Sequence, residues 1–312
     1  MNTLQHALNE YLDMRRALGF KLHDAGRALA DFVSFMERHH ATYITRPLAL
    51  AWAKQPSQVR PTEWARRLSW VRMFARYRSA TDPRTQIPEP NLLPYRPQRA
   101  RPYLYSEREI RGLLRAALQL PSDDELQPWT YHCLFGLLSV SGLRLAEARN
   151  LKLNDIDLDA AVLTVRGTKF GKSRLVPLHA STCKVLTDYI GRREQIWAGR
   201  PVSSHLFVNR RGNRLDIGQI HRIFYRLSRR IGLRGPTDSH GPRLHDMRHR
   251  FATSTLLRWY RAGEDAERHM PILSAYLGHV HCSDTFWYLS AMPELMREAM
   301  ARLERRWEEA RS

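Results

Sequence analysis

The sequence has little cysteine and no long apolar stretch. Only Cys133, Cys183 and Cys282 occur among its 312 residues, and none of them forms a C-x-x-C pair. Without a signal peptide, three widely spaced cysteines indicate reduced thiols rather than a disulfide framework, a zinc site or a redox site. No run of about 18 apolar residues occurs, and the pattern of a secretory signal is absent. We therefore expect a cytoplasmic protein with no membrane partner.

Acidic residues are too few to balance the basic ones. The chain has 50 lysines and arginines against 31 aspartates and glutamates, a formal net charge of +19 at pH 7. The excess is greatest between residues 200 and 250, which hold 12 arginines and no lysine against three aspartates. Such a density of guanidinium groups is the electrostatic footprint of phosphate contacts. A polyanionic partner is therefore expected.

The apolar pattern predicts two domains joined by a linker. Hydrophobic residues make up 43% of the chain, which is a globular composition. Apolar residues at helical spacing predict a small helical bundle over residues 1–81. Six prolines and four arginines follow in residues 82–102 and predict an extended, basic linker, because proline interrupts both helices and strands. Two basic domains connected in this way can close around a duplex.

A second, mainly helical domain is expected over residues 103–292. Ser106, with Glu109 three residues later, predicts a capped helix start, and residues 134–140 indicate a buried helix. Residues 162–165 and 175–178 read as two strands joined by a turn. The predicted fold class is therefore mainly α with a small antiparallel β-sheet (α+β), and residues 293–312 are expected to form a last, amphipathic helix.

Two short segments in the second domain place an arginine beside another reactive group. In Ser141–Glu147, Arg144 stands at a turn into a helix with an acid three residues later, which by itself is typical of a surface ion pair. His245 and Arg248 stand one helical turn apart, so both can address one group. His245 and His249 have the spacing of a zinc pair, but the neighbouring guanidinium disfavours a dication there.

A third segment, Leu277-Gly278-His279, is followed nine residues later by Tyr288. A lone tyrosine in an apolar segment is most often a packing residue. Tyr260 and Tyr276 are equally good candidates for a reactive phenol when each is considered alone. The order of the segments along the chain distinguishes them.

Taken in order, these segments resemble the tyrosine recombinases, the phage integrase family. S-G-L-R-L-A-E resembles the family's first arginine box, and T-K-F-G-K-S-R-L-V-P-L resembles its β-hairpin lysine segment. H-D-M-R-H-R-F-A-T resembles the second box, and L-G-H followed by T-F-W-Y resembles the tail box with its nucleophile. The matches extend from residue 141 to residue 288. The helical bundle resembles the family's core-binding, DNA-binding domain in character rather than by motif.

The resemblance implies a six-residue catalytic site with no metal and no cofactor. Its residues are Arg144, Lys169, His245, Arg248, His279 and Tyr288. The tyrosine attacks a DNA phosphorus and leaves a 3′-phosphotyrosyl link with a free 5′-hydroxyl, and no ATP is needed because the ester conserves the energy of the bond. The two arginines hold the phosphate, since a guanidinium donates two parallel hydrogen bonds and stays charged.

The remaining roles concern protons and support. His245 accepts or returns the tyrosine proton, and His279 is a further hydrogen-bond donor to the phosphate. Lys169 protonates the leaving 5′-oxygen; Lys172 lies on the same turn and is the alternative, although counting back from the R-L-V-P-L strand favours Lys169. Glu147 is expected to orient the first arginine or its helix.

The expected function is site-specific recombination or integration of duplex DNA. A type IB topoisomerase, which nicks and reseals without a partner duplex, and a catalytically inactive DNA-binding accessory protein are the alternatives. The resemblance also implies a homotetramer on two recombination sites, a monomer or weak oligomer when free, association with the nucleoid, and accessory DNA-binding proteins as an open question. The last helix can fold back on its own domain or dock on a neighbouring protomer.

Overall fold

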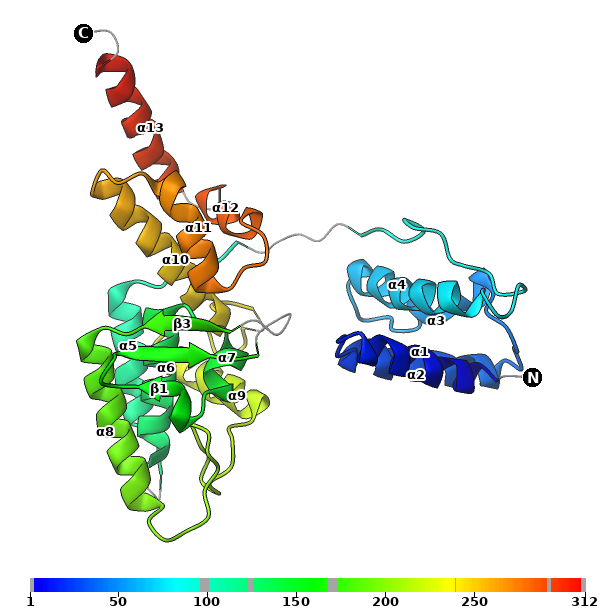
Figure 1. Cartoon of the computed structure of the whole chain (residues 1–312), viewed down its shortest axis with the longest axis horizontal. Helices are drawn as coiled ribbons and strands as arrows, with labels where there is room; N and C mark the ends of the chain where they lie inside the picture. Colours follow the sequence, from blue (N-terminus) through cyan, green and yellow to red (C-terminus); the bar gives the residue numbers. More distant parts are fainter. Residues whose placement is uncertain are drawn as a thin grey trace. The chain divides into compact units, whose positions relative to one another are not determined.

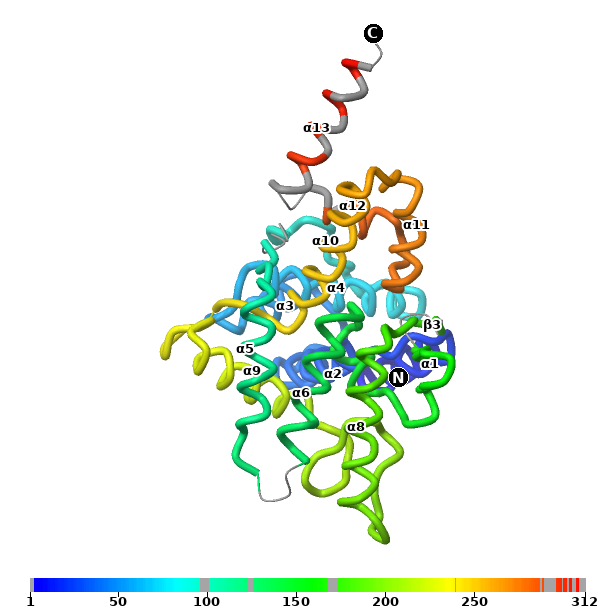
Figure 2. The backbone as a smooth tube through the Cα atoms, turned by 90° about the vertical axis from the view of Figure 1, so that its left-hand side faces the viewer, coloured from blue at the N-terminus to red at the C-terminus, as the bar shows by residue number. Residues whose placement is uncertain are grey.

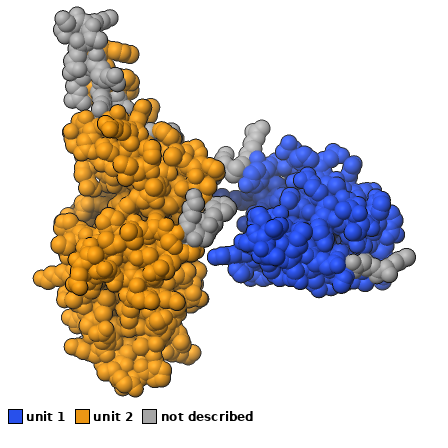
Figure 3. Space-filling model, viewed as in Figure 1, with its two compact units in different colours: residues 1–100 blue, residues 101–312 orange. Residues whose placement is uncertain are grey.

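The computed structural model describes residues 3–95, 101–122, 126–167, 173–238, 240–290 and 293–309. The chain divides into two compact units, residues 1–100 and residues 101–312 (Figure 3). Helices dominate both units, and a three-stranded antiparallel sheet belongs to the second (Figure 1). The predicted fold class is therefore confirmed. Among the described helices, none combines the length and the apolar character needed to cross a bilayer.

The described residues of the first unit form four helices around an apolar core. They are α1 (Leu4–Ala17), α2 (His23–Arg38), α3 (Arg46–Lys54) and α4 (Pro61–Arg78). The Thr45 side chain caps α3 by accepting a hydrogen bond from the Leu48 amide. Phe32 and Trp52 are fully buried and meet edge to face, and the Trp52 indole donates to Asp31 at 2.9 Å. Helical spacing of apolar residues accordingly produces a bundle with a continuous interior.

The proline-containing segment after α4 contains no helix or strand up to residue 95, but it does not stand free of the bundle. Thr85 and Leu93 are buried, and Ile87 packs against the core of the first unit. The Arg72 guanidinium donates to the carbonyls of Pro88 and Glu89, both at 2.8 Å. Prolines stop regular structure, but the apolar residues between them still gain free energy by burial. The first unit therefore extends beyond residue 81.

The second unit is built around one helix that is apolar on all sides. This helix, α6 (Leu126–Ser141), packs against α5 (Glu107–Leu118), α8 (Ala180–Ile196) and α10 (Leu244–Arg261), and α5 runs beside it in both views (Figures 1 and 2). Ser106 and Glu109 form the expected capping box at the start of α5. The other helices are α7 (Leu145–Asn150), the 3₁₀ turn η1 (Leu153–Asp155), α9 (Ile217–Arg230), α11 (Ala266–Leu277), α12 (Ser283–Ser290) and α13 (Pro293–Glu309).

The sheet has the order β1-β2-β3, with β1 (Ile156–Asp157), β2 (Val162–Val165) and β3 (Arg174–Pro177). Leu163 pairs with Val176, and both are buried against the core, whereas Leu175 on the opposite face is exposed. This alternation confirms the two strands read from the sequence; the two-residue β1 was missed because it is too short to show a period. Between β2 and β3, residues 168–172 are outside the described residues, and Lys169 and Lys172 are among them.

Candidate active site

The first arginine box is formed at the sharp turn from α6 into α7. Gly142 has φ 61°, and a Cβ at this position would lie 2.6 Å from Cδ1 of Phe251, so the turn needs glycine for both its backbone angle and its space. Arg144 follows at the start of α7, and its backbone N–H donates to Oε2 of Glu147 at 3.0 Å. Its Nη1 donates to Oε1 of the same carboxylate at 2.8 Å. The acid three residues later therefore contacts this arginine, as expected.

The C-terminus of α11 holds two guanidinium groups on its last carbonyls. Gly278 ends the helix in the left-handed conformation, with φ 66°. Arg144 Nη2 donates to the Gly278 carbonyl at 3.1 Å, and its Nη1 lies 3.5 Å from the Leu277 carbonyl. Arg248 Nη2 donates to that same Leu277 carbonyl at 2.6 Å. Helix-terminal carbonyls lack partners within the helix and carry the negative end of its dipole, so this end attracts cations.

Arg248 comes from the first turns of α10 and is only 2% exposed. Its Nη1 donates to the carbonyl of Gly142 at 2.7 Å. This hydrogen bond connects the second arginine box to the turn that contains the first. Burial and the nearby positive charge of Arg144 lower the pKa of Arg248 to about 10. The group therefore stays protonated at neutral pH, and two permanent cations lie side by side.

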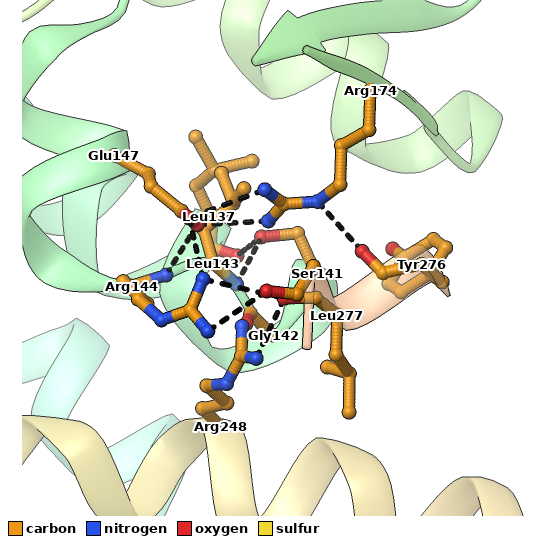
Figure 4. A network of polar contacts seen from close by, with 11 residues as sticks. Leu137, Ser141, Gly142, Leu143, Arg144, Glu147, Arg174, Arg248, Tyr276 and Leu277 are labelled. Carbon is orange, nitrogen blue, oxygen red and sulfur yellow. Dashed lines mark hydrogen bonds and ion pairs between the residues drawn. The ribbon is translucent and has the colours of Figure 1, made fainter. Parts of the chain in front are cut away.

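A third arginine joins this cluster from β3. Arg174 Nη1 and Nη2 donate to the two carboxylate oxygens of Glu147 at 3.1 and 2.8 Å, and its Nε donates to the Tyr276 carbonyl at 2.7 Å. Figure 4 shows the carboxylate between Arg174 and Arg144, with Arg248 reaching the same turn from α10. Burial alone would raise the pKa of Glu147, but the hydrogen bonds and charge of Arg174, together with those from Arg144, bring it below its usual value. The carboxylate is thus ionised at neutral pH.

Tyr288 lies on α12, beside the histidines of the other motifs. Tyr288 is 2% exposed and belongs to a small hydrophobic core that it shares with apolar residues of α10 and α11. The centroid of its ring is 6.2 Å from that of His279, to which it is stacked, and 5.4 Å from that of His249. Burial, followed by the charges of Arg248 and Arg144, lowers the pKa of His279 to about 4. The His279 ring is therefore neutral at physiological pH.

The orientation of His279 is fixed by one short hydrogen bond. Its Nδ1 lies 2.7 Å from Oγ1 of the fully buried Thr285. When the threonine hydroxyl donates to Nδ1, the neutral ring carries its proton on Nε2. That nitrogen is then available as a hydrogen-bond donor.

His245 lies in the first turn of α10, one turn before Arg248. His245 is exposed as a whole residue. The protein around its imidazole nevertheless displaces enough water to lower the pKa of the ring, and the charge of Arg248 lowers that pKa further. Its ring centroid lies 4.7 Å from that of the buried His249. Burial and the neighbouring His245 lower the pKa of His249 to about 4. A neutral His245 at physiological pH is able to accept a proton.

The second unit thus brings together five of the six predicted site residues: Arg144, His245, Arg248, His279 and Tyr288. Lys169 and its alternative, Lys172, lie outside the described residues. The sequence motifs did not predict a role for Arg174 or for the carbonyls of α11. Arg174 was considered only as part of the R-L-V-P-L strand that favours Lys169 over Lys172. No local signal in the sequence identifies Arg174, because its partners Glu147 and Tyr276 lie far from it along the chain. In the described part of the chain, no group of three or more histidine, cysteine, aspartate or glutamate residues could hold a metal ion.

Comparison with known proteins agrees with this arrangement. Residues 106–294 match the model of the phage integrase family. The chain is 65% identical over 312 residues, 99% of each chain, to a Sinorhizobium fredii (strain NBRC 101917 / NGR234) protein named as integrase/recombinase y4rB. It is 30% identical to the tyrosine recombinase XerC of Thermodesulfovibrio yellowstonii over 174 residues, 55% of this chain and 53% of that one.

The fold is also similar to that of the Tn1549 transposon integrase in complex with circular intermediate DNA. The TM-score is 0.65 at 17% identity, with 95% of this chain and 99% of that chain covered. The two chains therefore share a fold. The chain belongs to the phage integrase family, the tyrosine recombinases, and the resemblance drawn from its motifs is confirmed.

Proposed function

We propose that the chain is a site-specific recombinase or integrase that cuts and rejoins duplex DNA through a 3′-phosphotyrosyl intermediate, without metal or ATP. The observation that carries this proposal is the shared carbonyl of Leu277. Arg144 and Arg248 both approach it, although the three residues come from segments far apart in the sequence. The relatives named as recombinases, and the integrase structure described with DNA, support the same reaction and a DNA substrate.

The arginines supply positive charge where the transition state gains negative charge. A guanidinium has five N–H groups; Arg248 uses one on each Nη for the carbonyls of Gly142 and Leu277, which leaves further donors for a phosphate. The carbonyls fix both cations beforehand, so that once a movement has uncovered the site the charges are already in place. Charge stabilisation of this kind takes the role that a metal plays in other phosphoryl-transfer enzymes.

Proton transfer completes each step. The Tyr288 phenol loses its proton as its oxygen bonds to phosphorus, and neutral His245 accepts that proton. The bond from phosphorus to the 5′-oxygen breaks, and Lys169, with Lys172 as the alternative, protonates the leaving oxygen. A 5′-hydroxyl from a partner duplex then attacks the phosphotyrosine, and the tyrosine leaves with its proton restored. Each exchange conserves one phosphodiester bond.

The burial of Tyr288 implies a movement before the first step. At 2% exposure in the free chain the residue offers almost no surface to a DNA phosphate. We therefore infer that binding of DNA, or of a neighbouring protomer, shifts the short helix α12 and uncovers the phenol. Cleavage then becomes dependent on assembly, which protects the cell from unpaired breaks.

The surface of α13 supports assembly with further copies of the chain. Met296, Met300, Leu303 and Trp307 are exposed along this helix, so a stripe expected to be apolar is not covered by its own unit. Exposed apolar stripes mark interaction sites. We propose that α13 docks on a neighbouring protomer in a homotetramer that holds two DNA sites, that the free protein is a monomer or weak oligomer, and that it acts at the nucleoid in the cytoplasm.

A recombination assay tests this function against its two alternatives. A plasmid carrying two copies of the DNA that flanks the native gene is incubated with the protein, with and without EDTA. We expect deletion or inversion between the copies in both conditions, because arginines rather than a metal ion stabilise the charge. Relaxation of supercoils on a plasmid without these copies favours a topoisomerase instead. Binding without any joined product indicates an inactive accessory protein, and a requirement for Mg²⁺ contradicts the mechanism.

A further inference from the structure

We propose that Arg174, the first residue of β3, is a positioning residue for strand transfer: it sets both phosphate-binding arginines and ties them to strand β3. The inference rests on the function proposed above and concerns the same site. Arg174 need not touch DNA in this role. It acts through Glu147 and through the C-terminal carbonyls of α11.

The first support is the number of contacts that one side chain makes. All three nitrogens of the Arg174 guanidinium donate to acceptors, two of them to the carboxylate of Glu147 and the third to the carbonyl of Tyr276. Its side chain is 11% exposed and that of Glu147 is 9% exposed, so this is not a solvated surface pair. A planar, forked donor group fits such a set of acceptors, whereas a lysine ammonium does not.

The second support is that these acceptors are the ones that hold the phosphate-binding arginines. Each oxygen of Glu147 accepts one hydrogen bond from Arg174 and one from Arg144. The Tyr276 carbonyl directly precedes those of Leu277 and Gly278, which hold Arg248 and Arg144. Loss of Arg174 removes one of the two hydrogen bonds to each Glu147 oxygen and the one to the Tyr276 carbonyl. We expect the carboxylate and the end of α11 to shift as a result, and the two cations with them.

The third support is the place of Arg174 in the hairpin. It pairs with Val165, the last pair of the β2–β3 ladder before the segment that joins the two strands. Lys169 and Lys172 belong to that joining segment in the sequence, outside the described residues. The fit is also tight, because a Cβ at Gly278 would lie 2.9 Å from Nη1 of Arg174. A single side chain therefore connects β3 to the groups that hold Arg144 and Arg248.

The test compares cleavage rates under conditions in which all DNA is bound. Arg174→Ala, Arg174→Gln and Arg174→Lys are mixed in excess with a nicked duplex of the flanking DNA, in which loss of a short strand traps the covalent adduct. Arg166→Ala is the matched control, because Arg166 lies on the same hairpin and its Nε donates to the buried carboxylate of Asp155 at 2.7 Å. Melting temperatures and DNA affinities are measured for each variant.

We expect Arg174→Ala to slow adduct formation by about 100-fold or more, since a displacement of about 1 Å in a catalytic group has an effect of this size. Its DNA affinity should stay within about threefold of the wild type, and Arg166→Ala should keep its cleavage rate within the same range. Arg174→Lys retains the charge and so protects folding, but it should remain at least about tenfold slow because it cannot span three acceptors.

A second readout separates positioning from simple stabilisation of the fold. Replacing one nonbridging oxygen of the scissile phosphate by a methyl group removes its negative charge, and with it most of the need for the arginines. The defects of Arg144→Ala and Arg174→Ala should both shrink at least about tenfold on this methylphosphonate. The double variant should be no slower than Arg144→Ala alone, because residues that act as a unit are not additive.

The outcomes are distinguishable. An Arg174→Ala protein that cleaves at the wild-type rate overturns the inference alone. A defect that persists on the methylphosphonate and adds in full to that of Arg144→Ala also overturns it, because it indicates a structural role only. A wild-type protein that forms no adduct overturns the proposed function and this inference with it.

Discussion

Replacement of Gly142 by alanine tests whether the turn before α7 sets the geometry of the site. The residue has φ 61°, which costs a non-glycine residue about 1–2 kcal/mol. The added Cβ would lie 2.6 Å from Phe251 and 3.1 Å from Leu277, and overpacking of this kind costs about 1–3 kcal/mol. We therefore expect Gly142→Ala to lower the free energy of unfolding of the second unit by about 2–5 kcal/mol.

The matched control is Gly263→Ala. Gly263 has φ 73°, but no atom lies within 4 Å of a Cβ built there, so only the backbone cost of about 1–2 kcal/mol applies. The difference between the two variants isolates the clash. Denaturant unfolding of the full chain measures both free energies, and hydrogen exchange of α6 and α10 assigns the loss to the second unit.

The same substitution should also impair cleavage. The Gly142 carbonyl accepts from Arg248 Nη1 at 2.7 Å, so a shift of the turn moves Arg248, to which we assign phosphate binding. We expect adduct formation by Gly142→Ala to fall by at least about tenfold under conditions in which the variant is still folded. If Gly142→Ala and Gly263→Ala lose equal stability and cleave equally well, the turn does not hold the site as described.

Two further predictions concern pH and salt. The pKa of buried His249 is about 4 in the folded chain against about 6.5 in the unfolded chain. Between these pH values the unfolded chain binds more protons than the folded chain. The free energy of unfolding therefore falls by about 3 kcal/mol as the pH drops through this range. His249→Gln should flatten the dependence of unfolding free energy on pH, and an unchanged slope contradicts the assignment. DNA affinity should fall about 10³-fold or more between about 50 and 200 mM salt, because neutralised phosphates release counterions; a flat response in a binding titration is incompatible with a phosphate-binding surface.

Much of the fold could be read from the sequence because its signals are local. Apolar spacing, the Ser106–Glu109 cap and the alternation in β2 and β3 each depend on residues a few positions apart. The packing of the segment after α4 was harder to predict. Its prolines indicate an extended chain, but the apolar residues between them, Ile87 and Leu93, pack on the bundle. Proline content reports the absence of helix, not the absence of packing.

The candidate site was predictable as a set of side chains but not as a structure. The order of the motifs along the chain singled out Arg144, Arg248 and the tail box as candidates. The acceptors that fix them are main-chain carbonyls at Gly142 and the end of α11, which have no side-chain signature. The partners of Arg174 lie 27 and 102 residues away in the chain, so no short motif encodes them.

The choice among tyrosines shows the same limit of local signals. Tyr276 stacks on Phe251, with ring centroids 5.3 Å apart, and burial raises its pKa to about 12. Its carbonyl, rather than its phenol, contributes to the cluster, by accepting from Arg174. Tyr288 instead lies beside the rings of His249 and His279. The environment of each ring separates the two residues, and it depends on contacts between α10, α11 and α12.

Identification of the residue that becomes joined to DNA tests the central claim most directly. The wild-type protein and Tyr288→Phe are incubated with the nicked duplex, and the trapped adduct is digested and sequenced by mass spectrometry. We predict a DNA-linked peptide that carries the nucleotide on Tyr288, and no adduct from Tyr288→Phe. An adduct on Tyr276 or Tyr260, or one that survives the substitution, contradicts the account.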